Sequence, residues 1–200
     1  MTYATAASTV GFVDKVTQSQ VCFRTLMDAF SHPALAREFV QQTSAWGTMS
    51  AAIVTVLLTL VDQDTAIWLD HPYAGDDELR AQIAFHCGAP IVTEPQRSAF
   101  AFISDASRIG DFARFAFGEP DFADRSTTLV VQTEKFHLGP HLFAGPGIPQ
   151  LRGFGAERLS ADFASQWLSN RRSFPLGVDL IFVTEAEVVA LPRSLRLLEV

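Results

Sequence analysis

The segment SAAIVTVLLTLVDQDTAIWLD, residues 50–70, decides the fold class. Ser50 offers an N-cap for a helix over residues 51–61, and this helix is apolar on nearly all sides. A helix with this pattern is buried on more than one side. The Asp-Gln-Asp triplet that follows is typical of a turn, and residues 65–69 are typical of a short strand. The segment therefore predicts a helix, turn and strand packed inside a layered domain.

Helices and strands alternate on both sides of this segment. Upstream, Phe23, Leu26, Met27 and Phe30 follow the i, i+3, i+4, i+7 spacing of a core-facing helix stripe. This predicts a helix over residues 14–30, and His32-Pro33 ends it. Further predicted helices span residues 76–87, 109–117 and 161–170, and predicted strands span residues 37–41, 98–103, 127–133, 142–144, 178–183 and 188–191.

Residues 139–155 carry five glycines and three prolines, which predicts a loop with at most a short strand inside it. The chain shows neither internal repeats nor a linker long enough to separate domains. Because strands and helices are mixed throughout, we expect one α/β domain over residues 1–200, with three layers and a mixed sheet.

The composition excludes several classes of protein. Of the 200 residues, 48% are hydrophobic and only 18% are charged, whereas globular chains average roughly 25% charged residues. A disordered chain needs the opposite balance. The net charge of −7 argues against a nucleic-acid partner, because an acidic surface repels the phosphate backbone. The surplus of apolar residues therefore belongs to a large core or to protein partners.

The sequence predicts a cytoplasmic protein without a membrane span. Its N-terminus has neither the positive charge nor the apolar stretch of a secretory signal. The longest apolar stretch, residues 51–61, is well short of the roughly 20 residues that a transmembrane helix needs. Two cysteines, Cys22 and Cys87, provide no disulfide framework.

Several kinds of catalytic site are not expected. The sequence has no phosphate-binding P-loop, no GxGxxG after a strand and no GxSxG nucleophile elbow. Only Lys15 and Lys135 occur against 13 arginines, and neither position suggests the desolvated lysine that aldimine chemistry requires. His137 and His141 have helical metal-ligand spacing, but the intervening Gly139-Pro140 prevents a helix, so we expect no metal site.

Other residues allow a structural and a functional interpretation. His86 next to Cys87 fits a helix end better than a reactive pair. The acids Asp62, Asp64 and Asp70 fit turns, with acid–base work or cation binding as the alternative. Arg171-Arg172 fits the carbonyls at a helix C-terminus, with a phosphate site as the alternative. Gly145-Pro146-Gly147 fits a chain reversal and equally an anion-binding nest of backbone N–H groups.

The most distinctive segment is SFPLGVDL, residues 173–180. Pro175 fixes the chain, Gly177 permits an unusual backbone angle, and Asp179 begins an otherwise apolar strand. An acid entering a buried strand needs a partner, and we expect Arg193 to supply it. The favoured interpretation is an ion pair that pins a turn, and the alternative is a contact with a ligand or another subunit.

Five segments carry a resemblance to a known family. They are FRTLMDAFSHP near the N-terminus, VLLTLVDQDTAIWL at residues 56–69, AGPGI at 144–148, FPLGVDLIF at 174–182 and ALPR at 190–193. In this order they span nearly the whole chain, which resembles the PhnH family of the bacterial carbon–phosphorus lyase system. Ala34 departs from a glycine frequent in the family, and Ser194-Leu195 replaces a Thr-rich ending; both departures affect the nearby turns.

The resemblance implies a fold similar to the large domain of pyridoxal-phosphate-dependent transferases, without that cofactor. It also implies a role in phosphonate catabolism, within a complex of G, H, I and J subunits with accessory ATP-binding subunits. One step joins an alkylphosphonate to the ribose of ATP with loss of adenine, which yields ribose 1-alkylphosphonate 5-triphosphate. The later radical step belongs to the J subunit, whose iron–sulfur cluster needs cysteines that this chain lacks.

On this basis we expect a non-catalytic or co-catalytic subunit without a cofactor or metal, which forms a homodimer when isolated and contacts the J subunit in the complex. The candidate structural or interface residues are Phe174, Pro175, Leu176, Gly177, Asp179 and Arg193. The alternative is an independent enzyme that binds a nucleotide or phosphonate at Gly145 and Gly147, with Arg152 as the charge partner. A third interpretation is that the chain is a scaffold that only solubilises a partner.

Overall fold

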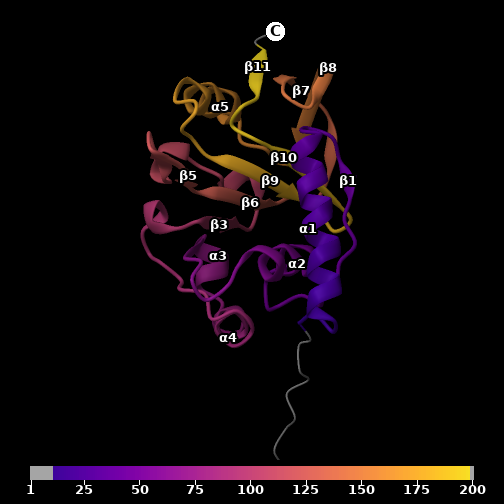
Figure 1. Cartoon of the computed structure of the whole chain (residues 1–200), viewed down its shortest axis with the longest axis vertical. Helices are drawn as coiled ribbons and strands as arrows, with labels where there is room; N and C mark the ends of the chain where they lie inside the picture. Colours follow the sequence, from indigo (N-terminus) through magenta and orange to yellow (C-terminus); the bar gives the residue numbers. More distant parts are fainter. Residues whose placement is uncertain (1–10, 199–200) are drawn as a thin grey trace, which may run out of the picture.

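The computed structural model describes residues 11–198, and a six-stranded sheet lies at its centre (Figure 1). The sheet has the order β1-β10-β9-β6-β3-β2. Its strands are β1 (Arg37–Glu38), β2 (Ile67–Leu69), β3 (Phe100–Ile103), β6 (Thr128–Gln132), β9 (Asp179–Val183) and β10 (Glu187–Leu191). Strands β2, β3, β6 and β9 are parallel, whereas β10 is antiparallel to both of its neighbours. The predicted α/β class and mixed sheet are confirmed.

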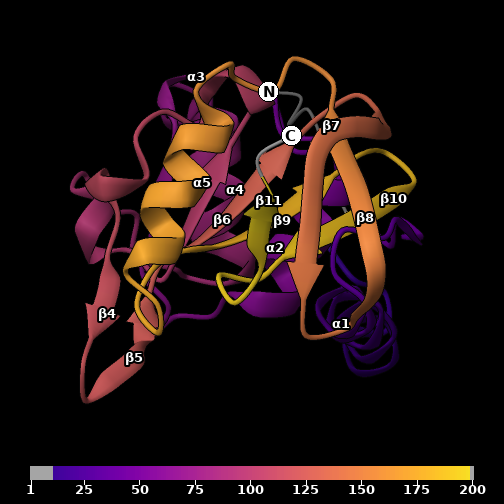
Figure 2. The same ribbon diagram turned by 90° about the horizontal axis from the view of Figure 1, so that it is seen from above.

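Each face of this sheet packs against its own layer (Figure 2). One face is covered by α1 (Lys15–Ser31), α2 (Ala51–Leu60), α3 (His71–Ala74) and α4 (Asp77–His86). The other face is covered by α5 (Phe163–Arg172) and by a second sheet of β7 (Phe136–Gly145), β8 (Ile148–Ala156) and β11 (Arg196–Leu198). Side chains alternate between the two cores along each strand: Val130 faces the first core, whereas Leu129 and Val131 face the second.

Short elements complete the fold between β2 and β6. They are the 3₁₀ turns η1 (Pro95–Arg97), η2 (Ala106–Arg108) and η3 (Phe112–Arg114), followed by the hairpin strands β4 (Phe117–Glu119) and β5 (Phe122–Ser126). The predicted helix over residues 109–117 is wrong, because only one 3₁₀ turn forms before the chain extends into β4. Helix α3 and strand β5 were not predicted.

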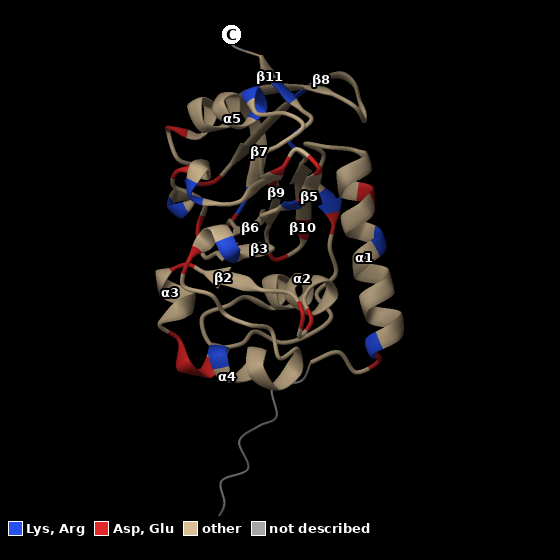
Figure 3. Cartoon of the chain, turned by 60° about the vertical axis from the view of Figure 1, so that its left-hand side comes forward, with Lys and Arg blue, Asp and Glu red and all other residues tan. Residues whose placement is uncertain are grey.

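Helix α2 confirms the segment that decides the fold. The Ser50 hydroxyl accepts a hydrogen bond from the Ile53 N–H at 3.4 Å and caps the helix. Six consecutive residues from Ala52 to Leu57 are buried, and Figure 3 shows no charged residue on this helix. Asp62 then forms the predicted turn, because its Oδ1 accepts from the Asp64 N–H at 3.0 Å and the Thr65 hydroxyl at 2.6 Å.

Helix α1 forms where predicted, and Leu26 and Phe30 of the predicted stripe do pack on the core, but the buried face is rotated away from Phe23 and Met27. The buried residues are Cys22, Leu26 and Ala29, whereas Phe23 and Met27 are each 49% exposed. Asp14 caps the helix by accepting from the Thr17 N–H at 3.1 Å. The buried face therefore consists of Cys22, Leu26 and Ala29, and the larger Phe23 and Met27 remain at the surface.

Residues 136–156 form a long hairpin, so the loop predicted for residues 139–155 is wrong. The hairpin tolerates its glycines because β7 and β8 approach closely: a Cβ on Gly139 would collide with the Phe154 carbonyl oxygen. Pro140 lies where the pairing shifts between His137 and His141, a position at which a strand does not need an N–H donor.

Two smaller differences concern the segment before the sheet. The predicted strand over residues 37–41 forms only at Arg37–Glu38. Ala34 has a φ of 56°, a conformation that glycine adopts more readily than alanine. Among the described residues, no helix has the length and apolar character needed to cross a membrane.

Candidate functional site

The SFPLGVDL segment forms the turn between α5 and β9. Asn170, in the last turn of α5, holds this turn: its Nδ2 donates to the Val178 carbonyl at 2.9 Å, and its Oδ1 accepts from the Val178 N–H at 2.8 Å. Gly177 has a φ of 127°, and a Cβ at this position would lie 2.5 Å from the Asn170 Oδ1. Only glycine fits both the backbone angle and the space. The Phe174–Pro175 peptide bond is cis.

Asp179 and Arg193 form the expected ion pair at the base of this turn. The Arg193 Nη2 lies 3.6 Å from the Asp179 Oδ2, and the Arg193 backbone N–H donates to the Oδ1 at 2.7 Å. Burial raises the pKa of Asp179, while the hydrogen bond and positive charge from Arg193 partly offset this effect. Arg193 also donates at 2.6 Å to the Ser126 hydroxyl and to the Gly177 carbonyl. The guanidinium therefore joins β5, β9 and the turn.

The candidate motif thus separates into an inner and an outer part. Gly177, Asp179 and Arg193 interact with one another, whereas Phe174 is 47% exposed and carries the Arg171 guanidinium 4.3 Å above its ring. Pro175 is exposed and Leu176 is half-buried. Ser126 and Asn170 were missed from the sequence, because common polar residues distant from the motif give no local signal.

Arg152 and the neighbouring glycines lie on the β7–β8 hairpin, at the C-terminus of α1. The Arg152 guanidinium donates to the Pro33 carbonyl at 2.7 Å. Gly145 and Gly147 form the hairpin turn, and a Cβ on Gly147 would lie 2.7 Å from the Pro33 Cδ. Helix-terminal carbonyls carry partial negative charge, so this surrounding disfavours a bound anion.

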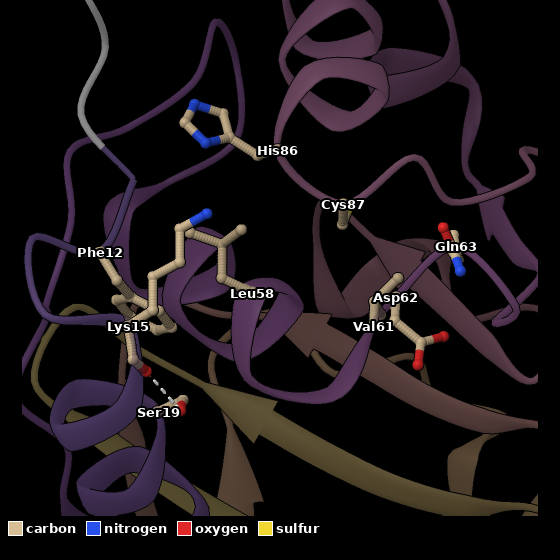
Figure 4. Close-up of a pocket in the computed structure, with 9 residues that line it drawn as sticks. All are labelled: Phe12, Lys15, Ser19, Leu58, Val61, Asp62, Gln63, His86 and Cys87. Atoms are coloured by element: carbon tan, nitrogen blue, oxygen red, sulfur yellow. Dashed lines mark hydrogen bonds between the residues drawn. The ribbon is translucent and has the colours of Figure 1, made fainter.

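A cleft of about 350 Å³ lies between α1, α2 and α4 (Figure 4). Its lining residues are Phe12, Lys15, Ser19, Leu58, Val61, Asp62, Gln63, His86 and Cys87. The Lys15 side chain extends toward the His86 ring in Figure 4, and apolar side chains form the floor. A volume of this size suits a small molecule.

Three polar groups of the cleft, His86, Cys87 and Asp62, already make contacts within the chain. The His86 ring stacks on Trp46 with centroids 4.8 Å apart. The Cys87 thiol donates to the Ile83 carbonyl, and burial raises its pKa, which disfavours the nucleophilic thiolate. Hydrogen bonds from Thr65 and the Asp64 backbone lower the pKa of Asp62, so this carboxylate serves its turn. In residues 11–198, no three histidine, cysteine or acidic side chains are grouped for a metal ion.

Asp70 does not have the turn role that the sequence predicted for it. It is 4% exposed at the end of β2, and its Oδ2 accepts from the Ser104 hydroxyl at 2.6 Å and the Ser104 N–H at 3.0 Å. It therefore ties together the carboxyl ends of two parallel strands, β2 and β3.

Arg171 and Arg172 lie in the last turn of α5, at the helix end where the sequence predicted them.

Comparison with known families decides the assignment. Residues 10–198 match the family described as "Bacterial phosphonate metabolism protein (PhnH)". The chain belongs to the PhnH family. A Rhizobium meliloti protein named "Alpha-D-ribose 1-methylphosphonate 5-triphosphate synthase subunit PhnH" is 35% identical over 187 residues, which cover 93% of each chain.

A second relative comes from Stutzerimonas stutzeri and is named "Putative C-P lyase subunit protein HtxG". It is 29% identical over 179 residues, which cover 88% of this chain and 84% of the relative. Both matches extend over most of the chain, and the family match over residues 10–198 includes the sheet and its two covering layers.

Proposed function

We propose that this chain is the H subunit of a bacterial carbon–phosphorus lyase complex, and that it supports formation of ribose 1-alkylphosphonate 5-triphosphate from ATP and an alkylphosphonate. The observation that carries the proposal is the 35% identity over 187 residues to a relative named as a subunit of the corresponding synthase. The second relative, named as a putative subunit of the C–P lyase, agrees with it.

The geometry supports a non-catalytic or co-catalytic role. Asp179 is paired with Arg193, Arg152 binds backbone carbonyls, and the Cys87 thiol has a raised pKa. Each of these groups already has a structural partner or an unsuitable protonation state. Catalytic groups for the synthase step are then expected from other subunits, or from a site completed by them.

We assign the partners as the G, I and J subunits, with a homodimer for the isolated chain. Exposed apolar side chains support contacts of this kind, since Phe23, Met27 and Phe174 are all about half exposed. Obligate interfaces are rich in such side chains. The outer part of the α5–β9 turn, with Phe174 and Pro175, is the proposed interface feature.

The finer fold assignment is likewise a proposal: one domain over residues 1–200, similar to the large domain of pyridoxal-phosphate-dependent transferases and without that cofactor. The mixed sheet with layers on both faces supports the likeness. Lys15 and Lys135 are both exposed, and an exposed lysine lacks the desolvation that favours aldimine formation. Two free cysteines, Cys22 and Cys87, suit the reducing cytoplasm that we propose as the location.

The alternative function is an independent enzyme that binds a nucleotide or a phosphonate. The cleft between α1, α2 and α4 is the feature that favours it, because its volume suits a small molecule and Lys15 could pair with an anion.

Two measurements distinguish the functions. We expect the tagged chain to co-purify with co-expressed G, I and J subunits in a fixed ratio, as seen by native mass spectrometry. We also expect calorimetry of the isolated chain with ATP and with methylphosphonate to show no binding at millimolar ligand. Tight binding by the isolated chain, weakened by Lys15→Ala, together with failure to co-purify, would establish the alternative.

A further inference from the structure

Two arginine–aromatic pairs lie at the surface where the α5–β9 turn meets the β4–β5 hairpin. The Arg171 guanidinium lies 4.3 Å from the centroid of the Phe174 ring, and that of Arg125 lies 3.9 Å from the centroid of Phe122. Phe174 is 47% exposed and Phe122 is 44% exposed. We call these four residues the arginine–aromatic surface.

Hydrogen bonds join the turn that carries Phe174 to the hairpin that carries Phe122 and Arg125. The Gly177 N–H donates to the Phe117 carbonyl at 2.9 Å, which ties the turn to β4. Arg193 donates to the Ser126 hydroxyl at 2.6 Å, and Ser126 directly follows Arg125 on β5. Figure 2 shows the turn after α5 lying beside the base of the hairpin, which projects from the body of the molecule.

Both guanidinium groups are free of ion pairs to described residues. Over residues 11–198, the basic side chains within 4.0 Å of a carboxylate are those of His32, Arg37, Arg80, Arg158 and Arg193. Arg125 and Arg171 stack on rings instead, although the chain has 22 acidic residues. Stacking fixes one face of a guanidinium, and the terminal N–H donors can then make a bidentate contact, although the Arg171 Nε itself is buried.

We propose that the arginine–aromatic surface docks another subunit of the proposed complex through carboxylate side chains set among apolar residues. This inference rests on the proposed function. Arginine and aromatic side chains are the residues most enriched at the energetic centres of protein interfaces. A stacked guanidinium loses little side-chain entropy when it binds a carboxylate, because the ring already restricts it.

The surroundings favour isolated carboxylates over a polyphosphate. Arg171 lies in the last turn of α5, whose terminal carbonyls carry partial negative charge. Glu119, Asp121 and Asp124 lie on the same hairpin as Arg125. These groups repel a triphosphate, which carries several negative charges, more strongly than they repel a single carboxylate held by the directional donors of each arginine.

The test measures affinity of the wild-type chain and its variants for the co-expressed G, I and J subunits, by biolayer interferometry. We expect R125Q and R171Q each to weaken binding about tenfold, and the double variant to weaken it at least a hundredfold. Arg171→Lys keeps the charge but loses the bidentate edge, so it should fall between wild type and R171Q. Arg97→Gln on η1 and Phe85→Ala on α4 are exposed controls that should bind like wild type.

Arg125 is exposed on the hairpin, so R125Q should leave the melting temperature unchanged and keeps the test valid if R171Q misfolds. If the wild type binds and folded R125Q and R171Q bind equally well, the proposed surface is wrong while the function stands. If ATP at millimolar concentration competes for Arg125 and Arg171, the surface is an anion site and the proposal is also wrong. If the wild type itself does not bind, the proposed function fails together with this inference.

Discussion

At the scale of single residues, Asp179 and Arg193 show what the sequence can predict. An acid at the start of an apolar strand requires a partner, and the structure supplies Arg193 through a contact of 3.6 Å and a backbone hydrogen bond of 2.7 Å. The roles of Ser126 and Asn170 depend on how β5 and α5 pack around the turn. Such contacts are set by tertiary structure, so no local pattern predicts them.

Removing the Arg193 side chain should destabilise the fold. Arg193→Ala leaves the Asp179 carboxylate half-buried without its cation, a change that costs about 3 kcal/mol in comparable pairs. We expect this loss in the free energy of unfolding at pH 7, measured by urea denaturation. Arg196→Ala, three residues away and exposed, is the matched control and should change the free energy of unfolding little.

The same pair predicts a pH dependence. Burial raises the pKa of Asp179 above its ordinary value of 3.8, so the folded chain holds this proton more tightly than the unfolded chain. Stability of the wild type relative to Asp179→Asn should therefore fall as pH rises from 3.8 through the raised pKa, and stay constant above it. An increase over that window would show that the Arg193 charge outweighs burial.

At the scale of elements, α1 shows why a periodic pattern can predict a helix and still misplace its buried face. The predicted stripe of Phe23, Leu26, Met27 and Phe30 is buried at Leu26 and partly buried at Phe30. Side-chain size favours Phe23 and Met27 as further core residues, but the buried face includes Cys22 and Ala29 instead. The periodicity therefore predicts the helix, whereas the surface that packs against the helix determines which of its residues are buried.

Substitutions at Leu26 and Phe23 should distinguish the buried face of α1 from its exposed face. Leu26→Ala should lower the free energy of unfolding by about 2–4 kcal/mol, because it leaves a cavity in the core. Phe23→Ala should cost less than about 1 kcal/mol, because half of that side chain is already in water. Equal losses in chemical denaturation would contradict the observed orientation of α1.

The α5–β9 turn makes a second prediction at this scale. Gly177→Ala places a methyl group against the Asn170 side chain at a φ of 127°, and should lower the free energy of unfolding by about 2–3 kcal/mol. Gly75→Ala is the matched control, since Gly75 has a φ of −80° and the atom nearest to its Cβ would be the His71 carbonyl oxygen, at 3.3 Å. It should lower stability much less than Gly177→Ala does in thermal denaturation. A neutral result at both positions would mean that the turn relaxes.

At the scale of the whole molecule, one sheet serves two hydrophobic cores. The strands β3, β6, β9 and β10 contribute alternate side chains to each core, so neither core can persist without the sheet. We therefore expect a single cooperative transition in calorimetry, with equal calorimetric and van't Hoff enthalpies. Two resolved transitions would contradict the single domain proposed for residues 1–200.

The layered α/β class followed from the sequence because buried helices and strands alternate along it. The second sheet could not be predicted from the sequence. The glycines and prolines of residues 139–155 are typical of a loop, and only the close pairing of β7 with β8 explains them within strands. The arginine–aromatic surface was equally hidden, since Arg125 and Arg171 are 46 positions apart and the hairpin brings their surroundings together. The surplus of apolar residues therefore divides between two cores and exposed positions such as Phe23 and Phe174.

The central claim is that this chain acts only as part of a multi-subunit synthase. The most direct measurement is formation of ribose 1-methylphosphonate 5-triphosphate and adenine from ATP and methylphosphonate, followed by ³¹P NMR, with purified subunits mixed in all combinations. We predict product only when this chain and the other core subunits are present together, and none with this chain alone. Product formed by the isolated chain, or by the other subunits at an undiminished rate without it, would contradict the account.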